Sequence, residues 1–86
     1  MIVGVQFTGL LNPGETARWF TFDWPSEWDV VWTVVPTSPN PGAPQIGWSV
    51  AVERASDPDI TYWITIQNLT SQNVDIEARY AIMNLG

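Results

Sequence analysis

Residues 24–36, WPSEWDVVWTVVP, decide how the rest of the chain is interpreted. The segment holds three of the six tryptophans, and their spacing of four residues would align them along one side of a helix. Its second half is rich in valine and threonine, which are stiff at χ1 and fit a pleated sheet better than a helix. We therefore predict at most one helical turn over residues 25–28 and a strand that begins near Asp29.

Both faces of this strand, residues 30–35, are largely apolar. Such a pattern is typical of a central strand that is covered on both sides, or of a strand whose outer face contacts another chain. The pattern alone favours neither interpretation over the other.

Alternation of apolar and polar residues predicts five further strands, over residues 2–10, 16–23, 45–55, 60–67 and 74–82. Segments rich in proline, glycine, asparagine and aspartate separate them, at residues 12–15, 36–44, 56–59 and 68–73. The turns at residues 12–15 and 68–73 are expected to close hairpins. Six strands without a convincing helix predict a single all-β domain over residues 1–86, an antiparallel β-sandwich or compact jelly roll.

The predicted core contains the side chains that alternation places on one side of each strand. They are Phe20, Phe22, Trp48, Val50, Tyr62, Ile64, Ile66, Ile76 and Tyr80. The same alternation puts Trp19 and Trp63 on the opposite, polar sides of their strands. Small residues on the outward side of residues 45–55 leave room for a close neighbour.

Composition excludes several functions. The chain lacks cysteine and histidine, so it has no disulfide, no thiolate metal site and no histidine general base. Nine acidic residues against three arginines give a formal charge of −6, which repels phosphate backbones, and no run is long enough to span a bilayer. We expect no nucleic-acid partner, no membrane span, no cofactor and no bound metal.

Carboxylates are the strongest candidates for catalysis, and they cluster among the tryptophans at Asp23, Glu27 and Asp29. Paired carboxylates beside aromatic rings are the equipment of a glycosidase, but a sandwich of this size offers little cleft for a sugar chain. We interpret these groups as solvated acids and predict no enzymatic activity. The segment Asn68-Leu69-Thr70 matches the N-glycosylation pattern, which occurs often by chance, so no modification is predicted.

Tryptophans outside the core suggest binding. Sugar rings present flat C–H faces that stack on an indole, and neighbouring polar side chains pair with the hydroxyls. The candidate ligand-binding residues are Trp19, Asp23, Trp24, Trp28 and Trp63. We predict a non-catalytic, lectin-like carbohydrate-binding module with a glycan ligand that forms homo-oligomers; the alternative is an assembly domain whose exposed tryptophan faces form subunit interfaces.

Two stretches resemble a known family. Residues 9–16, GLLNPGET, followed by the aromatic strand of residues 19–22, resemble the opening of bacterial pre-peptidase C-terminal β-sandwich domains, which begin with a G-x-L-x-x-G-E turn. Residues 61–82 are similar in rhythm to the final two strands of those domains, whereas the middle strands lack the Asp-Leu pattern of the family. The resemblance implies an accessory binding or anchoring role and carries over no functional residue.

Overall fold

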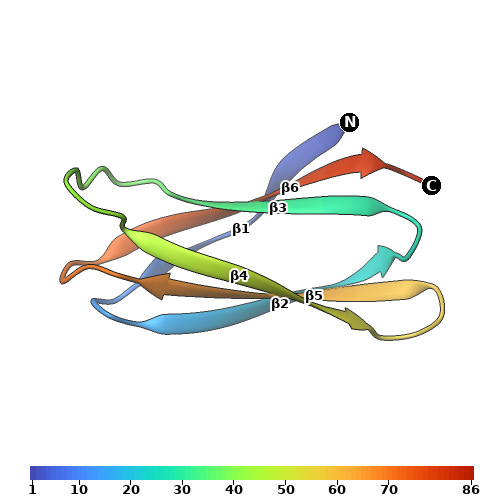
Figure 1. Cartoon of the computed structure of the whole chain (residues 1–86), viewed down its shortest axis with the longest axis horizontal. Helices are drawn as coiled ribbons and strands as arrows, with labels where there is room; N and C mark the ends of the chain where they lie inside the picture. Colours follow the sequence, from blue (N-terminus) through green and yellow to red (C-terminus); the bar gives the residue numbers. More distant parts are fainter.

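Six antiparallel strands form two three-stranded sheets in the computed structural model, which describes residues 1–86 (Figure 1). The strands are β1 (Ile2–Leu11), β2 (Thr16–Pro25), β3 (Asp29–Pro36), β4 (Ile46–Arg54), β5 (Asp59–Asn68) and β6 (Val74–Asn84). One sheet has the order β1-β6-β3 and the other the order β2-β5-β4. The predicted all-β sandwich is confirmed. No helix in the structure is long and apolar enough to cross a lipid bilayer.

The connections differ from the prediction. Only β4 and β5 form a hairpin of consecutive strands, because β1 and β2, and likewise β5 and β6, lie in different sheets. The predicted hairpins at residues 12–15 and 68–73 are therefore wrong, and both turns carry the chain from one sheet to the other. Residues 25–28 form a single turn in which the Trp28 amide donates to the Pro25 carbonyl at 3.1 Å, and β3 begins at Asp29 as predicted.

β3 lies at the edge of its sheet, so it is not a central strand covered on both faces. Trp32 and Val34 point into the core and are buried, whereas Val31 is 51% exposed on the outer face. The apolar character of both faces of β3 therefore leaves an uncovered outer surface.

The core lies between the two sheets and is formed by Leu11, Trp32, Val34, Tyr62, Ile64, Ile66, Val74, Ile76 and Ala78. The predicted positions of Tyr62, Ile64, Ile66 and Ile76 are confirmed, and Val50 and Tyr80 pack against the core while partly buried. The central strands β5 and β6 supply most of these side chains, because each is flanked by a strand on both sides.

The predicted faces of β2 are reversed. Trp19 lies opposite Ile64 and packs against the core, whereas Phe20 lies opposite Trp63 and is 57% exposed. Gly9 makes this possible, because an added Cβ there would lie only 3.1 Å from the Trp19 ring. Trp19 in turn stacks on Phe7, with ring centroids 5.0 Å apart. The prediction of Phe20 and Phe22 as core residues, and of Trp19 as an outward residue, is wrong.

Trp48 faces the predicted side of β4 but does not belong to the core. It lies opposite Ile66 in the β4–β5 ladder, and Ile66 is completely buried. β4 is an edge strand with a neighbouring strand on one side only, and Trp48 is 39% exposed. The inward side of this strand was predicted correctly, but the prediction of Trp48 as a core residue is wrong.

Asn68 joins the loops at one end of the sandwich. Its side chain is 1% exposed, and its Nδ2 amide lies 2.6 to 3.2 Å from the carbonyl oxygens of Leu11, Asn12 and Gln72. Its Oδ1 accepts hydrogen bonds from the amide and hydroxyl of Thr70, both at 2.8 Å. The asparagine of the N-glycosylation pattern is thus a buried structural residue whose amide nitrogen is already occupied.

Candidate functional site

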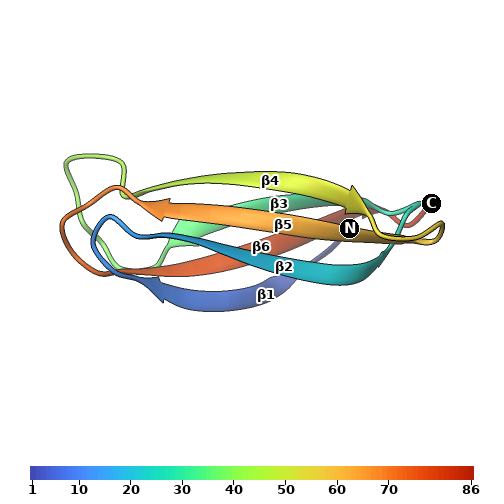
Figure 2. The same cartoon turned by 90° about the horizontal axis from the view of Figure 1, so that it is seen from below.

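The outer surface of the β2-β5-β4 sheet carries exposed aromatic rings beside polar groups. Figure 2 shows the three strands side by side, with β5 between the other two. We call this surface the aromatic face, and its members are Arg18, Phe20, Phe22, Ser49, Ala51, Glu53, Trp63 and Thr65. Strand alternation brings these side chains to one side, because the intervening residues of β2 and β5 fill the core.

Three rings form a continuous strip on the aromatic face. The rings of Phe20 and Trp63 lie 5.0 Å apart with an interplanar angle of 32°, and Phe22 extends the strip at 5.9 Å from Phe20. Phe20 and Phe22 are 57% and 61% exposed. Phe22 lies beside an irregularity in β2, where Asp23 adopts a left-handed φ of 64° before Trp24 resumes the pairing with β5. Such local bends commonly redirect side chains at the rim of a sheet.

Polar contacts hold Trp63 in place. Its indole Nε1 donates a hydrogen bond of 2.8 Å to Glu53 Oε1 on β4. From the other side, the Arg18 guanidinium on β2 lies 5.1 Å from the centre of the indole ring, within the range of a cation–π interaction. The ring at the centre of the face is therefore oriented before any ligand arrives, which reduces the entropy lost on binding.

A shallow groove of about 270 Å³ runs beside Trp63. Its lining residues are Arg18, Ser49, Val50, Ala51, Trp63 and Thr65. The groove exists because β4 presents the small side chains of Ser49 and Ala51 next to the bulky indole. It combines an aromatic wall with hydroxyl groups and a guanidinium, so it offers one apolar surface and several hydrogen-bonding groups to a small polar ligand.

The five residues predicted to bind ligand are not brought together. Trp63 alone belongs to the aromatic face. Trp19 packs inside against Phe7, and Asp23 is exposed at the irregularity in β2. Sequence reasoning missed Phe20, Phe22, Arg18 and Glu53, and the available signal was the alternating run Arg18, Phe20, Phe22 read with the opposite face outward.

Trp24 and Trp28 belong to an aromatic cluster at one end of the sandwich. The Trp24 ring lies 5.6 Å from Trp32 and 5.4 Å from Tyr80 in edge-on arrangements, and Trp28 lies 6.3 Å from Trp24. The Trp24 indole donates to the Thr21 hydroxyl at 3.0 Å, whereas the buried Nε1 of Trp32 has no hydrogen-bond partner. Edge-to-face packing of this kind stabilises a core. Trp24 packs against the core, whereas Trp28 is half-buried and joins the cluster through Trp24.

The same cluster contains the phenol of Tyr62. Burial, and to a lesser extent the negative charge of Asp29, raises the pKa of Tyr62 above its ordinary value of 10.0. Among the carboxylates, no group of three or more lies close enough together to hold a metal ion. In the turn between β4 and β5, Asp59 accepts a hydrogen bond from the Ser56 hydroxyl at 3.2 Å, which is the arrangement of an ordinary polar turn.

The fold and its surface define a small antiparallel β-sandwich with a solvent-exposed aromatic groove on one sheet. Comparisons with family models, with curated proteins and with solved structures each find no match to this chain. Inference about function therefore depends on the chemistry of the two outer sheet faces.

Proposed function

We propose that this protein is a non-catalytic, lectin-like carbohydrate-binding module that also associates with copies of itself. The observation that carries the proposal is the aromatic face, on which the rings of Phe20, Phe22 and Trp63 lie beside a groove that contains the Arg18 guanidinium and the hydroxyls of Ser49 and Thr65. A pyranose ring has an apolar C–H face that stacks on the negative face of an aromatic ring, while its hydroxyls need donors and acceptors. Both kinds of group are present on the aromatic face.

Each residue of the aromatic face has its own role in the proposed binding of a sugar. Phe20 and Phe22 offer open ring faces for stacking, because each is more than half exposed. Arg18 donates to hydroxyl oxygens of the ligand, and Ser49 and Thr65 both donate and accept. Trp63 supplies the wall of the groove. The resemblance of residues 9–22 to pre-peptidase C-terminal domains remains a prediction, and the accessory binding role that it implies agrees with this proposal.

A second candidate function is assembly through the aromatic face itself. It is favoured by the exposure of Phe20 and Phe22, since exposed aromatic rings are also enriched at protein interfaces. In that case the rings would be covered by another subunit, and added glycans would find no access. Sedimentation of a Phe20→Ser variant separates the two functions, because only the assembly function predicts a change in mass.

Intrinsic fluorescence tests the carbohydrate proposal. The protein would be titrated with soluble oligosaccharides of glucose, N-acetylglucosamine, mannose, galactose and xylose. Trp63 is the one tryptophan on the aromatic face, so a bound sugar should shift its emission, and the shift should disappear in Trp63→Phe. Binding by that variant would then be followed by calorimetry. Absence of a shift and of heat with every sugar would contradict the proposal.

A further inference from the structure

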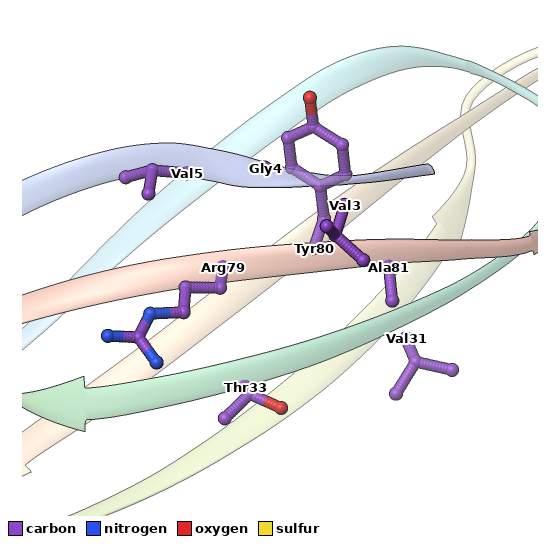
Figure 3. Close-up of a pocket in the computed structure, with 8 residues that line it drawn as sticks. All are labelled: Val3, Gly4, Val5, Val31, Thr33, Arg79, Tyr80 and Ala81. Atoms are coloured by element: carbon purple, nitrogen blue, oxygen red, sulfur yellow. The ribbon is translucent and has the colours of Figure 1, made fainter. Parts of the chain in front are cut away.

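The opposite outer surface, on the β1-β6-β3 sheet, is aliphatic around Ala81 and charged at Asp75, Glu77 and Arg79. Val3 on β1 and Val31 on β3 lie on either side of Ala81, and Val5 and Thr33 lie on either side of Arg79. We call this surface the aliphatic face, and its apolar members are Val3, Val5, Leu10, Val31, Ala81 and Met83. Figure 3 shows β6 passing between the side chains of β1 and those of β3.

The aliphatic face is hollowed along its middle strand. A groove of about 400 Å³ lies between Val3 and Val5 on one side and Val31 and Thr33 on the other. Its floor is low because β6 presents the methyl group of Ala81 beside Arg79 there, and because the Tyr80 ring points inward past Gly4, where a Cβ would lie 2.5 Å from the phenol oxygen (Figure 3). The face thus has two apolar ridges with a groove between them.

This face lacks the chemistry that recognises a sugar. It exposes no aromatic ring for stacking, and its one cation, Arg79, already donates to Glu77 Oε2 at 2.6 Å. Val3 is 67% exposed and Val31 is 51% exposed. Asp75, Glu77 and Arg79 point outward along the same strand as Ala81, so charged groups border the apolar patch at one end. An apolar centre with a polar rim is typical of a homodimer interface.

We infer that the aliphatic face binds a second copy of the same chain in a two-fold symmetric, sheet-on-sheet dimer. The molecule measures 42 × 24 × 16 Å, so the outline of its broad side covers at most about 1,000 Å², which can accommodate the roughly 800 Å² per partner of a standard stable interface. A two-fold axis lets a valine ridge of each copy enter the groove of the other, because the same patch meets itself. Aligned packing of twisted sheets provides the required geometry.

Charge adds a testable property to this dimer. Each chain carries a formal charge of −6, so two copies repel one another at low ionic strength. Added salt screens this repulsion, and apolar contacts are not weakened by it. The dimer should therefore become tighter as the sodium chloride concentration rises, opposite to an interface held by ion pairs.

The dimer would be bivalent, a consequence that rests on the proposed carbohydrate function. The aromatic faces lie on the far sheets of the two sandwiches, so they point away from each other and from the interface. Two sites on one rigid particle bind a surface coated with glycans more tightly than one site does, without any new contact. Self-association and ligand binding thus use separate surfaces of the same subunit.

Sedimentation velocity with matched lysine variants tests the inference. The measurement uses protein concentrations up to about 100 μM, because a dimer is populated by mass action when the protein concentration exceeds its Kd. The wild-type protein should sediment as a particle of twice 9.6 kDa, and Val31→Lys and Val3→Lys should each sediment as monomers. Val52→Lys changes an exposed valine of β4 outside the aliphatic face and should remain dimeric. Circular dichroism melts confirm that each variant is folded.

Two results would overturn the inference: a monomeric wild-type protein, or a dimer that survives both Val31→Lys and Val3→Lys. Glycan binding is scored separately, by calorimetry on the monomeric variant. If Val31→Lys is monomeric and still binds a soluble oligosaccharide with unchanged affinity, both proposals hold. If the dimer forms as inferred but no sugar binds, the carbohydrate function alone fails.

Discussion

The ring of Phe20 on β2 lies 5.0 Å from the ring of Trp63 on β5, on the outside of the sandwich. The contact results directly from register, since the two residues are opposite one another in the antiparallel ladder. It exposes a phenylalanine that the hydrophobic pattern predicted in the core, and it creates an aromatic surface outside the core. Ligand binding is therefore expected to depend on Phe20 and Trp63, whereas stability should depend on the inward residues next to them in β2 and β5.

Phe20→Ser should weaken glycan binding and leave the fold nearly unchanged. The side chain is mostly exposed, so the free energy of unfolding should change by less than about 1 kcal/mol. Phe7→Ala is the matched control, because it removes a ring that stacks on Trp19 on the inner side, and it should cost about 3 kcal/mol. Calorimetric titration and urea unfolding measure the two effects. A large loss of stability in Phe20→Ser would show that the aromatic face is structural.

Trp19→Ala and Trp63→Ala should have opposite consequences, although both residues are central tryptophans of neighbouring strands. Trp19 packs against the core, so its truncation should cost about 3 to 5 kcal/mol. Trp63 contacts mainly Phe20, Arg18 and Glu53 on the outer face, so its truncation should cost less than about 2 kcal/mol and reduce binding. Chemical denaturation measures the free energy of unfolding of both variants. Equal losses would contradict the assignment of Trp19 to the inner side and of Trp63 to the outer side.

Asn68→Asp should destabilise the protein by about 3 kcal/mol. An ionised aspartate cannot donate, so the carbonyls of Leu11, Asn12 and Gln72 lose their partner and face a buried charge. Asn73→Asp makes the same chemical change at an exposed position and should alter stability by less than about 0.5 kcal/mol. Thermal melting of the two variants provides the comparison, and similar melting temperatures would count against a structural role for Asn68.

Stability should decline in alkaline solution through Tyr62. Its pKa is raised in the folded protein, so the unfolded chain releases the proton at a lower pH and the free energy of unfolding falls as the pH rises above about 10. Phenylalanine in the Tyr62→Phe variant cannot ionise, so the free energy of unfolding of this variant should fall less as the pH rises. Urea unfolding of both proteins from about pH 8 to about pH 11 measures it. Parallel curves for the two proteins would exclude Tyr62 as the cause.

The indole of Trp32 allows a test of an unpartnered buried N–H. Replacing it by phenylalanine removes ring volume but also removes the orphan donor, which itself costs about 1 to 3 kcal/mol while buried. Trp24→Phe removes the same atoms and in addition breaks the hydrogen bond to Thr21. Trp32→Phe should therefore be the more stable of the two variants in denaturant unfolding. The reverse order would mean that lost volume dominates at Trp32.

Much of the fold was predictable from period-two alternation. All six strands fall where the pattern placed them, and Tyr62, Ile64 and Ile66 are core residues because β5 is a central strand. Alternation could not decide which side of β2 faces inward, since that strand has a tryptophan on one side and two phenylalanines on the other. The choice depends on long-range contacts, with Gly9 and Phe7 of β1 making room for Trp19.

The candidate site was less predictable for the same reason. Trp63 was placed outward by its own strand, but its neighbours Phe20, Arg18 and Glu53 come from β2 and β4 and depend on pairing. Trp24 and Trp28 looked exposed because they flank a turn. Trp24 lies inward because the rings of Trp32 and Tyr80 contact it across the sandwich, and Trp28 is half-buried against Trp24. Local patterns cannot show such contacts between sheets.

A glycan array, probed with the labelled wild-type protein and with Phe20→Ser, tests the carbohydrate proposal most directly. The proposal predicts that the wild-type protein binds one or more glycans and that Phe20→Ser loses this signal while remaining folded. An array with no bound glycan, or with equal binding by both proteins, would contradict the assignment of a sugar site to the aromatic face.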